Sequence, residues 1–102
     1  MRRDEIIAKL RANERELRAS GVLSLALVGS FARDDAREDS DVDIVVRLAD
    51  DPVVRGFRHI GRLETLTRQL ESITGRSVDV IVAPVSNERL RQRIEMDQKV
   101  AF

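Results

Sequence analysis

Residues 29–46 have the sequence GSFARDDAREDSDVDIVV, and this stretch decides how the rest of the chain is interpreted. A glycine–serine pair opens it, and an Asp-x-Asp pattern, formed by Asp41 and Asp43, opens the apolar run that ends it. Side chains alternate between the two faces of a β-strand, so two aspartates separated by one residue project from the same face. We therefore expect two neighbouring carboxylates at the beginning of a strand.

Helical and β-type hydrophobic patterns alternate on both sides of this stretch. The expected elements are a helix at 3–19 ended by Gly21, a strand at 22–28, a short helix at 31–34, a loop at 37–40, a strand at 41–48, a turn at 50–52, a helix ending near 74, a strand at 77–83 and a helix at 87–100. This order, α-β-α-β-α-β-α, predicts an α/β (α+β) fold. We expect one domain, residues 1–102, with a small, possibly mixed, three-stranded sheet flanked by helices.

The composition excludes several classes of protein. Eighteen basic and eighteen acidic residues give a net charge of zero, whereas proteins that bind nucleic acid through its backbone normally carry a basic excess. Cysteine is absent, which excludes disulfides and thiolate metal sites. No apolar run has the length of a membrane span or the form of a signal peptide. We expect a cytoplasmic protein with no membrane partner and no direct nucleic-acid binding.

The carboxylates predict a metal site. Two adjacent carboxylates repel each other unless a proton or a cation neutralises them, and magnesium prefers carboxylate, water and phosphate oxygens. Asp79 interrupts the apolar run 78–82 and is the third candidate. If its strand lies beside that of Asp41 and Asp43, Asp79 can face the pair, complete a metal site and accept a proton. The competing interpretation of Asp79 is a buried salt bridge.

The glycine–serine pair suits phosphate binding. Gly29 and Ser30 lie where a strand ends and a helix begins, where glycine allows close approach and free N–H groups attract anions. Arg33 adds a permanent cation one turn later. A calcium loop is excluded because Ile44 stands where that loop requires glycine. His59, without a second histidine or any cysteine, receives no role.

Together these motifs resemble the signature of the DNA polymerase β-like nucleotidyltransferases, and specifically the minimal nucleotidyltransferase (MNT) group. The resemblance rests on Gly-Ser, a ten-residue gap, Asp-x-Asp and the later acid in SVDVIV (77–82). It implies that Asp41, Asp43 and Asp79 bind two Mg²⁺ ions and act in catalysis, and that Gly29, Ser30 and Arg33 contact the triphosphate. Asp34 stands where the family most often has glycine, and an acid there could repel phosphate.

Members this short are similar to antitoxins of HEPN–MNT toxin–antitoxin pairs. The resemblance implies transfer of AMP from ATP to a tyrosine hydroxyl of a helical HEPN-type toxin. Two alternatives remain at this point: an antitoxin that neutralises by binding alone, which Asp34 favours, or a small-molecule nucleotidyltransferase completed by a separate helical subunit. For the partner surface we expect exposed Phe31 and Phe102, and we expect Leu90 and Ile94 to complete the core.

Overall fold

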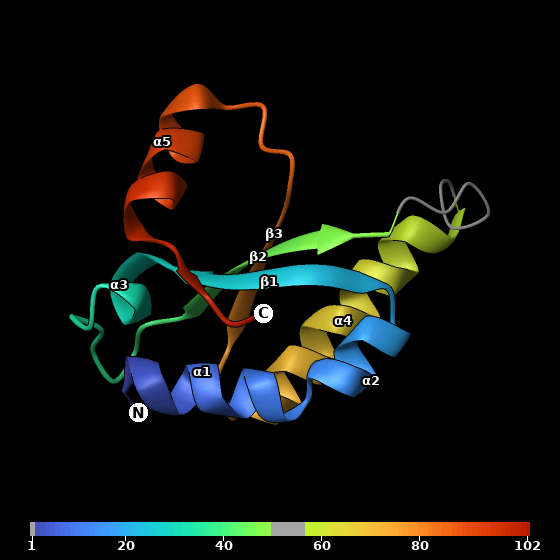
Figure 1. The fold of residues 1–102 in the computed structure, drawn as a ribbon, viewed down its shortest axis with the longest axis horizontal. Coiled ribbons are helices and arrows are strands. Elements are labelled where there is room, and N and C mark those ends of the chain that lie inside the picture. Colours follow the sequence, from blue (N-terminus) through green and yellow to red (C-terminus); the bar gives the residue numbers. More distant parts are fainter. Residues whose placement is uncertain (1, 50–56) are drawn as a thin grey trace.

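The computed structural model describes residues 2–49 and 57–102, and it has five helices and four strands within them (Figure 1). The elements are α1 (Arg3–Ala12), α2 (Glu14–Ala19), β1 (Val22–Val28), α3 (Gly29–Ala32), β2 (Val42–Leu48), α4 (Phe57–Thr74), β3 (Val78–Val82), α5 (Glu88–Asp97) and β4 (Lys99–Val100). The expected turn at 50–52 and the expected inward side chains of Phe57 and Ile60 lie outside the described residues, as does the side chain of His59.

The four strands form one mixed sheet in the order β3-β2-β1-β4. β1 pairs antiparallel with β2 and with β4, and β2 pairs parallel with β3. A parallel pair needs a crossover connection, and the α4 helix provides it between β2 and β3. The expectation of a mixed sheet flanked by helices is confirmed. The expectation of three strands is wrong by one, because Lys99 and Val100, expected to end the last helix, pair with the edge of β1.

The expected single helix at 3–19 is divided in two at Asn13. The Asn13 side chain donates a hydrogen bond to the carbonyl of Lys9 at 2.8 Å, and its backbone N–H bonds to Leu10 instead of to the residue four positions back. Asparagine competes in this way with the regular helical pattern. The apolar stripe continues through the break, because Ile6, Leu10 and Leu17 are all fully buried.

The core lies between the sheet and the helices α1, α2 and α4, which Figure 1 shows together on one side of it. In β2 the buried positions alternate as the sequence predicts, with Val42, Ile44 and Val46 inward and Asp43 and Val45 toward the opposite face. Burial of these β-branched side chains fixes the strand register, since a shift by one residue would expose them all. The core therefore determines which face presents Asp43.

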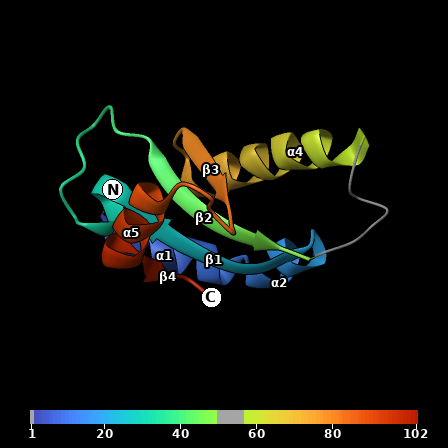
Figure 2. The same ribbon diagram turned by 90° about the horizontal axis from the view of Figure 1, so that it is seen from above.

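The opposite face of the sheet is only partly covered. Figure 2 shows α5 over the end of the sheet near α3, and α5 contacts α3 and β1. Ile94 anchors α5 with 8% of its surface exposed, as expected, whereas Leu90 is 38% exposed and does not complete the core. Met96 is also exposed.

The two phenylalanines expected at a partner surface differ from each other. Phe31 is 2% exposed and belongs to the core, so its assignment to a partner surface is wrong. The side chain is large enough to reach inward from the short α3, and the Arg76 guanidinium lies 5.0 Å from the centre of its ring. Phe102 is half-buried against the core with Arg18 over its ring at 4.9 Å.

None of the described helices combines the length and the apolar character that crossing a membrane requires.

Candidate functional site

Three neighbouring strands bring the predicted site residues to one end of the sheet. In the antiparallel pair Val28 lies opposite Asp43, so Gly29, the next residue, is adjacent to that carboxylate. In the parallel pair Asp43 lies opposite Asp79. Because neighbouring strands are about 4.8 Å apart, the side chains of the two aspartates emerge side by side from the same face. The sequence could predict this arrangement only under the condition that β3 pairs with β2.

Gly29 is positioned so that only glycine fits. Its φ of +74° is a left-handed conformation that other residues rarely adopt. A Cβ atom at this position would also lie 2.5 Å from Oδ2 of Asp43. The backbone turn at Gly29 therefore packs directly against the carboxylate, and both residues line the pocket described below.

Asp43 is the electrostatically perturbed member of the three acids. Its pKa is raised above the ordinary value, first because burial disfavours the charged form, and then because Asp79 and Asp41 repel a further negative charge. The Arg33 cation opposes this rise. Asp41 and Asp79 are exposed, so the expectation that Asp79 lies buried in its strand is wrong. The reason is that the outer face of β3 is not covered at this position.

The three carboxylates share one end of the sheet without forming a closed cage. Within residues 2–49 and 57–102, no three His, Cys, Asp or Glu side chains are arranged as a group that could hold a metal ion. Asp41 lines a hollow of its own, beside Asp39 and Arg76, whereas Asp43 lines the larger pocket described below. Exposed side chains change rotamer rapidly, so Asp41 and Asp79 can reorient toward Asp43 when a cation offsets their repulsion.

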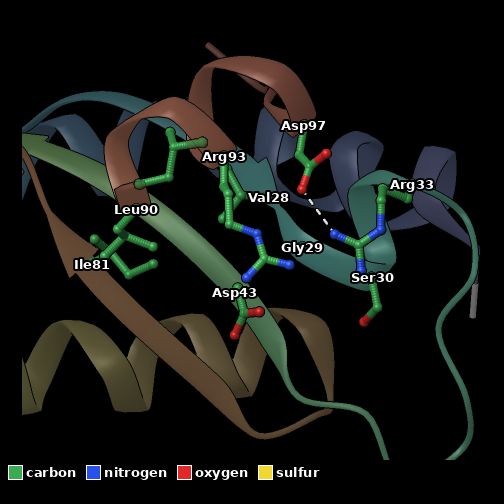
Figure 3. A pocket seen from close by; sticks show the side chains of 10 residues that line it. Val28, Gly29, Ser30, Arg33, Asp43, Ile81, Leu90, Arg93 and Asp97 are labelled. Atoms are coloured by element: carbon green, nitrogen blue, oxygen red, sulfur yellow. Dashed lines mark hydrogen bonds and ion pairs between the residues drawn. The ribbon is translucent and has the colours of Figure 1, made fainter. Parts of the chain in front are cut away.

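A pocket of about 300 Å³ opens above Asp43 (Figure 3). It is lined by Val28, Gly29, Ser30, Arg33, Asp43, Ile81, Leu90, Arg93, Ile94 and Asp97. The volume is at the lower end of the range of ligand pockets. The β1–α3 turn supplies one wall and α5 the other, so the pocket exists only because α5 folds back over the end of β1.

Arg33 lies in this pocket but is already engaged. Its guanidinium donates to Oδ2 of Asp97 at 2.8 Å and to Oδ2 of Asp35 at 3.2 Å. Both carboxylates raise the pKa of Arg33, Asp35 more than Asp97. The pair with Asp97 joins the C-terminal end of α3 to α5, as the dashed line in Figure 3 shows.

Asp34 has a local structural role. Its φ of +65° explains why a glycine would be preferred there, since glycine adopts positive φ without strain. Its Oδ1 accepts a hydrogen bond from the backbone N–H of Arg3 at 3.3 Å. The carboxylate is therefore directed to the first turn of α1.

The sequence interpretation missed the contribution of α5. Leu90, Arg93 and Asp97 line the pocket, although the helix was expected to supply only apolar packing. Their spacing places them with Ile94 on one helical face, so the pattern contained the signal that Arg93 and Asp97 share the face of a buried residue. Nothing in the pattern indicated that this face lies over the end of β1.

Known proteins share both the sequence pattern and the fold. Residues 7–101 match the family described as "Nucleotidyltransferase domain". A relative named "Protein adenylyltransferase MntA", from Thermococcus cleftensis, is 36% identical over 80 residues, which are 78% of this chain and 75% of the relative.

Two solved structures have the same fold. One, of a minimal nucleotidyltransferase, superposes with a TM-score of 0.75 at 26% identity, over 97% of this chain and 95% of that one. The other is the MNT antitoxin complex with the tri-AMPylated HEPN toxin of Shewanella oneidensis. It superposes with a TM-score of 0.56 at 22% identity, over 91% of this chain and 70% of the matched chain.

Proposed function

The chain belongs to the nucleotidyltransferase domain family, and on this premise we propose that it is an antitoxin that transfers AMP from ATP to a tyrosine hydroxyl of a HEPN-type toxin. The observation that carries the proposal is the adjacency of Gly29, Asp43 and Asp79 at one end of the sheet, where Gly29 and Asp43 line a pocket. The relative named as a protein adenylyltransferase, and the AMPylated toxin in the structural relative, support AMP and a protein acceptor.

The donor set suits magnesium. Asp43 is partly buried and its pKa is raised by burial and by its two neighbouring acids, so a divalent cation would relieve an existing unfavourable charge. We assign Asp41, Asp43 and Asp79 as its ligands. Two bound Mg²⁺ ions would neutralise the triphosphate and stabilise the attacking and leaving oxygens.

The chain's own residues would bind and orient the reactants. Gly29 and Ser30 would hold the β- and γ-phosphates at the turn, where the lack of a side chain permits close approach. Arg33, fixed by Asp97, would place a positive charge at the edge of the pocket. These contacts would direct the α-phosphate toward the carboxylates.

The transfer itself exchanges one bond to phosphorus for another. The acceptor hydroxyl oxygen bonds to the α-phosphorus, the bond from that phosphorus to the oxygen bridging the β-phosphate breaks, and pyrophosphate leaves. The hydroxyl proton passes to the carboxylate of Asp79, which is exposed and therefore accessible to an acceptor approaching over the sheet. The uncovered part of this face leaves room for a partner protein to present the hydroxyl.

The position of Asp34 no longer favours the alternative, an antitoxin that neutralises by binding alone. Asp34 was the residue whose charge could repel phosphate, but its carboxylate accepts a hydrogen bond from the beginning of α1. All three site acids are present, and Asp43 and Asp79 lie side by side on the same face of the β2–β3 pair. The arrangement therefore supports transfer over binding alone.

The test is incubation with labelled ATP, Mg²⁺ and the product of the neighbouring gene, followed by mass spectrometry of that product. We expect an adenylylated tyrosine. Transfer should be abolished by EDTA and by the double variant Asp41→Asn, Asp43→Asn, whereas Asp39→Asn, a nearby acid outside the proposed ligand set, should retain it. Neutralisation of the toxin by the double variant as complete as by the wild type would establish binding alone as the mechanism.

The role of Asp79 can be tested separately. Asp79→Asn should eliminate transfer but preserve more of the Mg²⁺-dependent ATP binding than Asp43→Asn does, because Asp43 lies at the centre of the three acids. Calorimetry measures ATP binding, and the mass of the partner reports transfer. Near wild-type turnover by Asp79→Asn would show that another group accepts the proton.

A further inference from the structure

One face of α5 forms the pocket wall opposite the β1–α3 turn. Leu90, Arg93, Ile94 and Asp97 are spaced at i, i+3, i+4 and i+7, so they lie together along the helix. Ile94 is buried and holds the helix on the sheet, while Asp97 binds Arg33. Arg93 is next to Ile94 and one turn before Asp97, so it has a fixed backbone position beside the pocket.

Among the described residues, Arg93 offers the pocket a cation that is not paired with a carboxylate. Figure 3 shows its guanidinium extending from α5 into the pocket, on the side of Asp43. In the described parts of the chain Arg93 forms no salt bridge, whereas Arg33 is shared between Asp35 and Asp97. Arg33 can bind an incoming anion only by giving up part of these contacts. Arg93 can bind an anion without giving up a salt bridge of this kind.

We propose that Arg93 binds the polyphosphate chain of the nucleotide from the α5 side, opposite Gly29 and Ser30. The inference rests on the proposed function and adds to it a residue outside the sequence signature. A guanidinium presents several donors in a planar fork that matches phosphate oxygens, and a charge-assisted bond of this kind is stronger than a neutral one. The pocket also contains Asp43 and Asp97, so a triphosphate needs a cation to offset their repulsion.

Arg91 provides a matched control on the same helix. It is an exposed arginine two positions away, it points to another side of the helix, and it pairs with Glu88 at 3.7 Å. Arg91→Ala and Arg93→Ala thus remove the same side chain and the same charge from one helix. Only Arg93 lines the pocket.

The experiment is calorimetry with ATP and with adenosine, each with Mg²⁺, on the wild type, Arg93→Ala, Arg93→Lys and Arg91→Ala. We expect Arg93→Ala to raise the Kd for ATP on the order of ten- to a hundredfold, the loss of one charge-assisted contact. Adenosine binding should be unchanged, since adenosine has no phosphate. The Kd of Arg93→Lys for ATP should lie between those of the wild type and Arg93→Ala, because lysine keeps the charge but lacks the planar fork of donors.

Any one of the following results would overturn the inference. Equal ATP affinities for Arg93→Ala and Arg91→Ala would show that Arg93 does not contact the polyphosphate. A parallel loss of adenosine binding, or a melting temperature lowered well beyond that of Arg91→Ala, would assign Arg93 to helix packing. Absence of ATP binding by the wild type would refute the proposed function together with this inference, whereas wild-type binding that Arg93→Ala leaves intact would refute the inference alone.

Discussion

Replacing Gly29 with alanine tests the packing of the β1–α3 turn against Asp43. The change has two separable effects, a strained backbone and a steric contact. Gly29 has φ +74°, and the added Cβ would lie 2.5 Å from Oδ2 of Asp43. Gly75 has nearly the same conformation, φ +71°, but apart from its chain neighbours no atom of the described residues lies within 4 Å of an added Cβ. Gly75→Ala is therefore the control for the backbone effect alone.

The expected magnitudes follow from these geometries. A left-handed alanine costs about 1–2 kcal/mol, which for a domain of this size lowers the melting temperature by roughly 4–16 °C in both variants. At Gly29 the carboxylate must also retreat by about 0.9 Å, the difference between 3.4 Å and 2.5 Å. Forcing a side chain away from its rotamer costs about 0.5–1.5 kcal/mol, so Gly29→Ala should melt a further ~2–12 °C lower.

Activity should separate the variants more strongly than stability does. A displacement near 1 Å in a catalytic group can reduce turnover about a hundredfold, so Gly29→Ala should lose most AMP transfer while Gly75→Ala retains it. The double variant Gly29→Ala, Asp43→Ala should recover the additional stability loss, because the nearest remaining atom of residue 43 is then Cβ at 3.5 Å. Transfer should stay absent in that variant because the carboxylate is gone.

The assays are thermal unfolding without metal and the labelled-ATP transfer reaction, both on the purified, folded variants. Equal melting temperatures for Gly29→Ala and Gly75→Ala would refute the steric contact. Full transfer activity of Gly29→Ala would refute the claim that the position of the Asp43 carboxylate depends on this turn. Failure of the double variant to recover stability would place the strain elsewhere.

Two further predictions concern stability. Asp43 has a pKa raised above its ordinary 3.8, so its ionisation opposes folding: in EDTA, Asp43→Asn should be more stable than the wild type at neutral pH, and this advantage should disappear as the pH falls below 3.8. A constant difference across pH would contradict the assignment. Asn87 accepts a hydrogen bond from the N–H of Leu90 at 3.0 Å, so Asn87→Ala should destabilise α5 by about 1 kcal/mol. Amide exchange in α5 should then be faster in the variant than in the wild type, with exchange in α4 unchanged.

The sequence predicted what depends on local periodicity and on residues near one another in the chain. The strand at 22–28 was predicted with its observed bounds, and Val42, Ile44 and Val46 alternate with Asp43 as a two-residue period requires. Gly29 follows β1 directly, as predicted. These features need no knowledge of which strands pair. Asp41, predicted to share a face with Asp43, precedes β2 and lines a separate hollow.

Some of the boundaries and side-chain positions predicted from local patterns were wrong. The stripe of Ile6, Leu10 and Leu17 predicted one helix, because buried positions keep their spacing across the break at Asn13. The last two residues of the expected final helix joined the sheet, since Lys99 and Val100 have β1 as a partner that the sequence alone does not supply. Phe31 was expected at the surface because nothing local indicated that the short helix turns it toward the core.

The sequence by itself determined most of the helices and strands, the acids and the glycine turn, because these are encoded by residues that lie close together in the chain. Only the tertiary structure decided that β3 lies parallel beside β2, with Asp79 opposite Asp43, and that α5 folds over the end of β1. Those contacts join residues far apart in sequence and depend on burying one face of the sheet and one face of a helix. They bring Arg93 and Asp97 into the pocket, where no pattern near the acids had indicated them.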